Sequence, residues 1–166
     1  MDPIFEELCG VDSAQTFNFF STGLREEVGD KKCRPDEMLY VASVLAHYAQ
    51  TSCHETGPLA IPKSPVDFFD NFIFGGHVND PESLEIGGSQ VILFAGFFRD
   101  QIARRHNVRW YDQIGQSFYE KASQRVKGVN KRELFGRLSE SLPMWTITCR
   151  NMHRTFRDNR FLLKIN

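Results

Sequence analysis

Residues 110–127 read WYDQIGQSFYEKASQRVK, and this stretch decides the fold class. Apolar side chains recur in it every three or four residues, and the polar side chains between them face away from that stripe. Such spacing is that of one face of an α-helix, and it differs from the two-residue alternation of a half-buried strand. The stretch therefore predicts an amphipathic helix that ends at Gly128. Its apolar stripe consists of Tyr111, Ile114, Phe118, Ala122 and Val126.

Helical periodicity extends over most of the chain on both sides of this stretch. Ser13 is a candidate N-cap for a helix that ends at Gly29, and Pro35 opens a second helix that finishes near Cys53. A Gly and two Pro within residues 54–63 predict a connection between helices. The remaining helices are expected over residues 64–74, from Asp80 onward, from Asn130 to Leu142 and from Pro143 to Phe156. We expect a short apolar piece at 161–165 to dock as a last turn.

The segment VILFAGFF at residues 91–98 is apolar nearly all round. A helix of that kind is buried on several sides at the centre of a fold, whereas a buried β-strand is the competing prediction. We expect a helix, because the chain holds no second strand-like segment that would pair with it. Gly87 and Gly88, just before it, predict a kink or a close helix crossing that needs absent side chains.

Composition places the chain among globular proteins. A net charge of −1 and 13% aromatic residues exclude intrinsic disorder. The apolar runs are far shorter than the ~18 residues of a membrane span, and the first residues, MDPIFEEL, show no secretory signal, so we expect a cytoplasmic protein without membrane association. The whole pattern predicts a single all-α domain over residues 1–166, with six or seven helices and little or no β-sheet. Residues 1–12 are a candidate for a loosely ordered N-terminal segment.

Three motifs carry a resemblance to known proteins. They are EMLYVASVLAHYAQ at 37–50, GGSQVILFAGFF at 87–98 and WYDQIGQSFYEKAS at 110–123. Together with FGRLSESLPMW at 135–145, they resemble a group of uncharacterised bacterial all-helical proteins of unknown function over most of residues 16–164. The resemblance implies an all-helical, bacterial, cytosolic domain. It supplies no catalytic residue, because the shared positions are mostly aromatic residues and glycines that specify packing.

The net charge hides a strong asymmetry along the chain. Residues 1–90 hold 15 acidic and 5 basic residues, whereas residues 91–166 hold 6 acidic and 15 basic residues, of which 11 are Arg. Two oppositely charged halves either pack on each other, or on a second copy, or leave a basic surface for nucleic acid. We expect packing, because Arg side chains pair helices through carboxylate bridges. The candidate interaction surface consists of Arg104, Arg105, Arg150, Arg154 and Arg157.

Metal binding has only weak candidates. Cys149 and His153 stand four residues apart, so they share one helix face, and Cys53 and His54 lie in the connection after the second helix. The chain has no paired CxxC motif and no HExxH motif, so we expect no metal site and no cofactor. The four cysteines follow no regular spacing, and we expect their thiols to be free.

Three classes of function remain open. The leading expectation is a non-enzymatic helical module that binds a protein partner, or a second copy of itself as a homodimer. The first alternative is a nucleic-acid-binding accessory protein that uses the Arg-rich C-terminal part. The second is a ligand-binding or enzymatic domain with a Phe-lined pocket near Gly88–Phe98, although no motif identifies a catalytic residue. A large flat apolar patch favours a protein partner, clustered basic side chains on an open face favour nucleic acid, and a closed cavity favours a ligand.

Overall fold

The computed structural model describes residues 2–52 and 80–159, and helices make up nearly all of them. These residues form seven α-helices and one π-helix and contain no strand, which confirms the expected all-α fold. Among them, no helix combines the length and the apolar character that crossing a bilayer requires. In chain order the elements are α1 (Pro3–Leu8), α2 (Ser13–Val28), α3 (Pro35–Thr51), α5 (Pro81–Val91), η2 (Ile92–Phe97), α6 (Arg99–Ile102), α7 (Val108–Arg125) and α8 (Val129–Asp158).

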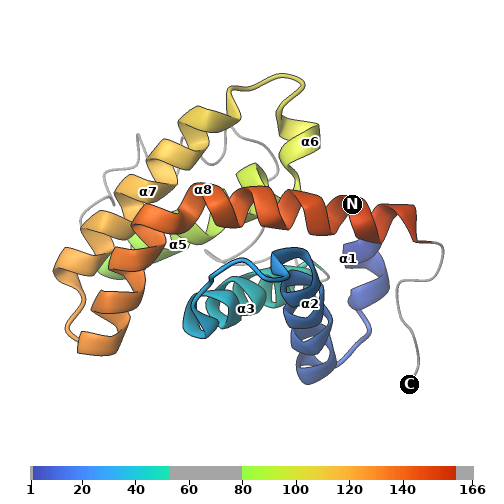
Figure 1. The fold of residues 1–166 in the computed structure, drawn as a ribbon, viewed down its shortest axis with the longest axis horizontal. Coiled ribbons are helices and arrows are strands. Elements are labelled where there is room, and N and C mark those ends of the chain that lie inside the picture. Colours follow the sequence, from blue (N-terminus) through green and yellow to red (C-terminus); the bar gives the residue numbers. More distant parts are fainter. Residues whose placement is uncertain (1, 53–79, 160–166) are drawn as a thin grey trace.

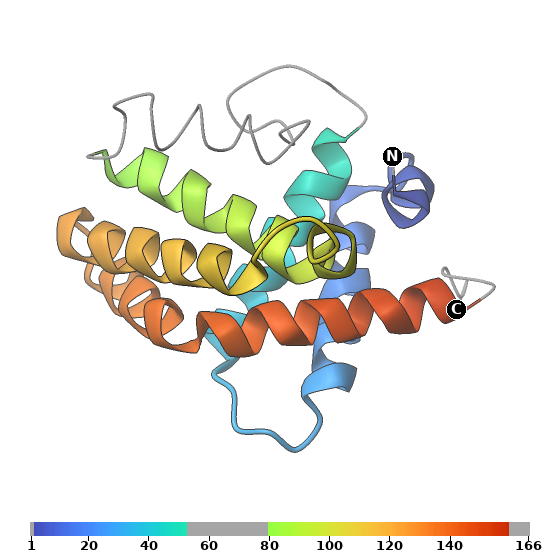
Figure 2. The same cartoon turned by 90° about the horizontal axis from the view of Figure 1, so that it is seen from above.

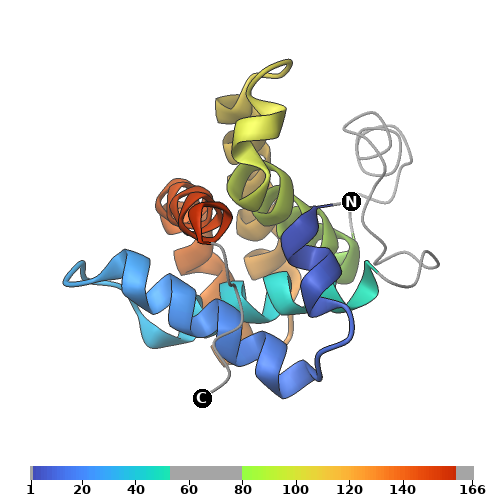
Figure 3. The same cartoon turned by 90° about the vertical axis from the view of Figure 1, so that its right-hand side faces the viewer.

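The helices form two packed groups that share α8. In Figure 2, α5, α7 and α8 lie side by side, and α7 contacts both α5 and α8. The second group is the pair α2 and α3, which crosses beneath α8 in Figure 1 and contacts it. Figure 3 looks along α8 and shows α1 on the side of α2 and α3, where it contacts α3. The long helix α8 therefore joins both groups.

The apolar stripes read from the sequence face this core. In α7, Tyr111, Phe118 and Ala122 are at most 5% exposed. The segment from Val91 to Phe97 is buried at every position, which confirms a central helix in place of a strand. Its last six residues form the π-helix η2, where the N–H of Phe98 donates to the carbonyl of Leu93, five residues back, at 2.9 Å.

Glycines let α5, α7 and α8 approach closely. A Cβ atom on Gly87 would lie 2.8 Å from the Phe118 ring, and one on Gly88 would lie 2.7 Å from the Tyr119 ring. The helix α5 runs through both glycines without interruption, so they serve a close helix crossing and do not make a kink. Among the described residues, the one positive φ, +56°, belongs to Gly29, which ends α2 where the sequence predicts.

The N-terminal segment differs from expectation. Residues 3–8 form α1, whose Ile4, Phe5 and Leu8 are at most 3% exposed. The carboxylate of Asp2 caps the helix by accepting from the N–H of Ile4 at 2.9 Å. The Phe5 ring also stacks on Phe97 at a centroid distance of 5.1 Å. This segment is therefore part of the core and not a loosely ordered end.

The prediction of two separate helices on either side of Pro143 is wrong. A single 30-residue helix, α8, begins at Val129 and continues through this proline. Proline lacks the N–H that would bond to the carbonyl four residues back, here that of Ser139. The side-chain amide of Gln116 on α7 donates to this carbonyl at 2.9 Å and replaces the missing bond. The helix predicted over 64–74, the connection at 54–63 and the last turn at 161–165 lie outside the described residues.

Candidate interaction face

Three arginines form one row along the C-terminal half of α8. Arg150, Arg154 and Arg157 follow each other at steps of four and three residues, which places them on one side of a helix. The side chains of Arg154 and Arg157 are 47% and 58% exposed, and Arg150 is half-buried. The aromatic residues between them, His153 and Phe156, are only 3% and 9% exposed. The row thus presents guanidinium groups to solvent and keeps its aromatic rings inside.

The turn after α6 adds two more arginines. Arg104 and Arg105 are exposed in this turn, which follows a helix that contacts α8 (Figure 1). On α6, the carboxylate of Asp100 accepts two hydrogen bonds from Arg154, from Nε at 2.6 Å and from Nη2 at 2.7 Å. This forked contact is the geometry in which Arg binds a carboxylate most strongly, and it fixes α6 against α8.

The electrostatics of Asp100 show that the α8 arginines gather around it. The hydrogen bond from Arg154 lowers the pKa of Asp100, and the positive charges of Arg154, Arg150 and Arg157 lower it further. One carboxylate therefore faces three guanidinium groups. We call the set of Arg104, Arg105, Arg150, Arg154 and Arg157 the basic face.

Most of the charge on the basic face stays unneutralised within the described residues. Arg150 donates to the side-chain oxygen of Asn151 at 3.2 and 3.0 Å, which leaves its charge unpaired. The Nε atom of Arg157 lies 4.0 Å from the exposed carboxylate of Asp158, a contact that contributes little. The side chains of Arg104 and Arg105 form no hydrogen bond and no ion pair within residues 2–52 and 80–159.

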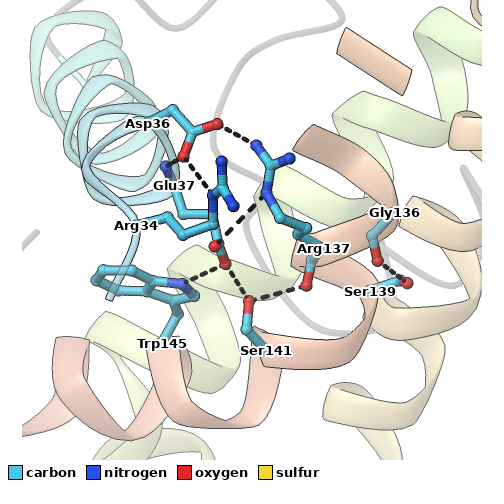
Figure 4. Close-up of polar contacts among 8 residues, drawn as sticks. All are labelled: Arg34, Asp36, Glu37, Gly136, Arg137, Ser139, Ser141 and Trp145. Carbon is cyan, nitrogen blue, oxygen red and sulfur yellow. Dashed lines mark hydrogen bonds and ion pairs between the residues drawn. The ribbon is translucent and has the colours of Figure 1, made fainter. Parts of the chain in front are cut away.

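The two oppositely charged halves do meet, at a different place. Figure 4 shows Arg137 of α8 between the carboxylates of Asp36 and Glu37 at the start of α3, and both contacts are ion pairs. Glu37 is buried and accepts hydrogen bonds from Ser141 Oγ and, at 3.2 Å, from Trp145 Nε1. This cluster fixes the first turn of α3 to the N-terminal half of α8.

The expected pairing between halves therefore holds for only part of the basic residues. Lys131 of the C-terminal half also forms an ion pair with an acid of residues 1–90, at 2.7 Å from Glu85. None of the five arginines of the basic face has such a partner among the described residues. Within the described residues of one chain, the expected pairing between halves therefore does not extend to these five arginines, and pairing with a second copy stays a prediction.

A buried ion pair near the basic face is part of the core. Arg99 is 8% exposed and Asp112 is 6% exposed, and Arg99 Nη1 lies 3.1 Å from Asp112 Oδ2. The same guanidinium donates to the carbonyl of Ala95 in η2 at 2.8 Å, and Thr146 donates to Asp112 at 2.9 Å. Burial raises the pKa of Asp112, and the Arg99 charge and these hydrogen bonds oppose that shift. All these groups are paired, and their contacts link η2, α7 and α8.

The weak metal candidates do not converge. Cys149 is fully buried, and burial raises the pKa of its thiol to about 12. The Nε2 atom of His153 lies 3.0 Å from Asp2 Oδ2. Burial alone would raise the pKa of Asp2, but its contacts with His153 and with backbone N–H groups outweigh burial and lower that pKa. In residues 2–52 and 80–159, no three His, Cys, Asp or Glu side chains gather where they could hold a metal ion, and Cys53 and His54 lie outside these ranges.

The cysteines depart from expectation at one position. Cys33 and Cys149 are free, but Cys9 is disulfide-bonded. Disulfides are rare in proteins of a reducing cytoplasm. The cytoplasmic location stays a prediction.

Asp100 is the residue of this face that sequence reasoning missed. It stands 54 positions from Arg154 in the chain, so no helical spacing connects them.

Comparisons of the chain with protein-family models, with curated proteins and with solved structures found no match. The resemblance to uncharacterised bacterial proteins therefore stays a prediction.

Proposed function

We propose that this protein is a non-enzymatic accessory protein that binds the phosphate backbone of nucleic acid through the basic face. One observation carries the proposal: five arginines lie on the C-terminal half of α8 and in the turn after α6, and among the described residues only Arg154 is paired with a carboxylate of another helix. The planar guanidinium group binds phosphate oxygens through two parallel hydrogen bonds. A cluster of this kind on an open face is the usual electrostatic footprint of a nucleic-acid-binding protein.

The arrangement supports binding that does not depend on base sequence. Binding to exposed bases uses aromatic side chains on which the bases stack, yet His153 and Phe156, which alternate with the α8 arginines, are buried. The exposed groups of this face are guanidinium groups, and contacts from these groups to phosphates position a protein without reading sequence. Non-specific contacts of this kind give Kd values of roughly 10⁻⁴–10⁻⁶ M at physiological salt.

The surface offers less support for an apolar protein interface. Stable protein interfaces depend on a contiguous apolar patch or on buried aromatic anchors. In the described part of the chain, the large apolar side chains that are exposed are Leu39, at 43%, and Val129, at 64%. They lie on α3 and at the start of α8, away from the basic face. An acidic protein segment or a second copy of the chain is the competing occupant of the face.

Fluorescence anisotropy with two labelled probes tests the proposal. The probes are a short duplex DNA of mixed sequence and a polyglutamate peptide of equal charge, both at low salt. The variant carries Arg150→Gln, Arg154→Gln and Arg157→Gln. Its matched control removes three exposed charges elsewhere, with Lys31→Gln, Lys32→Gln and Lys121→Gln.

We expect the duplex to bind the native protein, and a second duplex of different sequence to bind equally well. The arginine variant should lose at least about tenfold in affinity, since a hydrogen bond to a charged group contributes about 1.5–3 kcal/mol. The lysine control should retain most of the affinity. Tighter binding of polyglutamate than of DNA, or an equal loss in both variants, would overturn the proposal. Sedimentation of the free protein as a dimer that the arginine variant dissociates would also overturn it, because a second copy would then occupy the face.

A further inference from the structure

A cavity of about 300 Å³ opens between α3 and α5, on residues that the proposed function does not use. Its size is at the lower end of the range for small-molecule sites. This lining holds the rings of two tyrosines and His47 and no Phe, so it is a different place from the Phe-lined pocket expected near Gly88–Phe98, which stays a prediction. The lining residues are Tyr40, Ser43, Val44, His47, Tyr48, Glu82, Glu85, Ile86 and Ser89.

A chain of hydrogen bonds holds one carboxylate of the lining in place. Tyr40 donates its hydroxyl proton to Glu85 Oε1 at 3.2 Å. Because that proton is used, the contact of 3.3 Å between the Tyr40 and Tyr119 hydroxyls has Tyr119 as donor. Lys131 lies 2.7 Å from the other oxygen, Glu85 Oε2. Burial raises the pKa of both tyrosines, so they stay protonated and keep this direction of donation.

The other hydroxyl protons of the lining also point into the protein. Ser43 donates to the carbonyl of Tyr40 and Ser89 donates to that of Ile86, both at 2.7 Å. Since Ser89 has no second proton, Tyr48 is the donor in their contact of 2.7 Å. Burial raises the pKa of Tyr48 to about 12, so this hydroxyl also stays protonated at neutral pH.

The lining therefore offers mainly hydrogen-bond acceptors to a ligand, and the side-chain donor left among these residues is the ring N–H of the exposed His47. Glu82 is exposed, and its side chain forms no hydrogen bond or ion pair within residues 2–52 and 80–159. The hydroxyl groups retain their lone pairs, and Glu85 is only partly satisfied because each carboxylate oxygen accepts two bonds. Val44 and Ile86 supply apolar contact surface, and the two tyrosine rings can attract a cation.

We propose that this cavity is a binding site for a small organic cation, a primary amine with a short apolar body. The ammonium group supplies three donors to these acceptors and balances the charge of Glu82. The apolar body contacts Val44, Ile86 and the tyrosine rings. A neutral or anionic molecule of the same shape lacks these donors or adds repulsion, so the site discriminates by charge.

Isothermal titration calorimetry of the full chain with tyramine tests this site. Two probes of nearly the same shape serve as references: 4-hydroxyphenylethanol, which replaces the amine with a hydroxyl group, and 4-hydroxyphenylacetate, which is an anion. Two variants probe the lining. Glu82→Gln removes the unpaired charge, and Ser43→Trp fills the cavity from an exposed position, so neither change disturbs the core. The matched control is Glu120→Gln, an exposed acid on α7 outside the lining.

We expect tyramine to bind and both reference probes to bind at least about tenfold more weakly, as the loss of a charged hydrogen bond implies. Glu82→Gln should weaken tyramine by a similar factor, Ser43→Trp should abolish binding, and Glu120→Gln should change nothing. No binding of tyramine at millimolar concentration would overturn the proposal. So would equal binding of the alcohol, or full binding by the filled variant.

Discussion

The continuation of α8 through Pro143 makes a prediction whose size follows from the structure. The side-chain amide of Gln116 donates to the carbonyl of Ser139. This carbonyl lacks its usual backbone donor, because the residue four positions later is Pro143, which has no N–H. Gln116→Met keeps the length of this side chain and removes the donor. A typical hydrogen bond contributes about 1 kcal/mol, and an unsatisfied carbonyl costs about 1–3 kcal/mol when buried. Because Ser139 is half-buried, we expect the loss to be about 1–1.5 kcal/mol.

A double-mutant cycle with Pro143→Ala isolates this bond. Alanine at 143 supplies a backbone N–H to the Ser139 carbonyl, so Gln116→Met should cost nearly nothing in that background. The coupling free energy should therefore be about 1 kcal/mol, which exceeds the usual additivity error of about 0.5 kcal/mol. In thermal melts of the protein that keeps Pro143, Gln116→Met should lower Tm by about 2–4 °C.

Urea unfolding of the four proteins, followed by far-UV circular dichroism, provides the free energies. The reasoning fails if Gln116→Met costs the same with proline and with alanine at position 143. It also fails if the cost is absent in both backgrounds, because the Ser139 carbonyl would then be satisfied in another way.

Three further predictions concern packing, thiol reactivity and acid stability. Gly115→Ala should lower the free energy of unfolding by about 1–3 kcal/mol, because its Cβ would lie 2.5 Å from a neighbouring side chain. Gly136→Ala, with nothing within 4 Å, should raise it by up to about 1 kcal/mol in the same urea experiment. Iodoacetamide should label Cys33 and leave Cys149, whose thiol pKa is about 12, unmodified in the native protein, as peptide mass mapping checks. Folding lowers the pKa of Asp2 from its ordinary value of 3.8. Its carboxylate therefore stabilises the fold above pH 3.8, and this effect is lost as the pH falls through the lowered pKa. Calorimetry should find the Asp2→Asn variant less stable than the native protein at neutral pH but not in strong acid.

Local sequence signals predict most of the helices. The stripe of Tyr111, Phe118 and Ala122 is buried, and Asp80 caps the helix that the dipeptide Asp80-Pro81 indicates. These features depend on residues within a few positions of each other. Helical periodicity and capping chemistry are therefore sufficient to identify them.

The features that the sequence does not predict depend on partners far away in the chain. The continuation of α8 through Pro143 depends on Gln116, which belongs to another helix. The order of the N-terminal segment depends on the contact of Phe5 with Phe97. Composition indicates the charge asymmetry correctly. It does not show that Arg137 reaches the acids of α3 while Arg154 binds Asp100, because that depends on which helix faces lie together.

The salt dependence of DNA binding tests the central claim most directly. Among the residues that the structure describes, four arginines of the basic face have no ion pair with another helix: Arg104, Arg105, Arg150 and Arg157. Each phosphate contact on B-DNA contributes about −0.9 to the slope of log K against log salt concentration, so we predict a slope of about −3 to −4. The pair of changes Arg150→Gln and Arg157→Gln should make the slope shallower by about 2 units. A slope near zero, or an unchanged slope in this variant, would contradict the assignment of the basic face to nucleic acid.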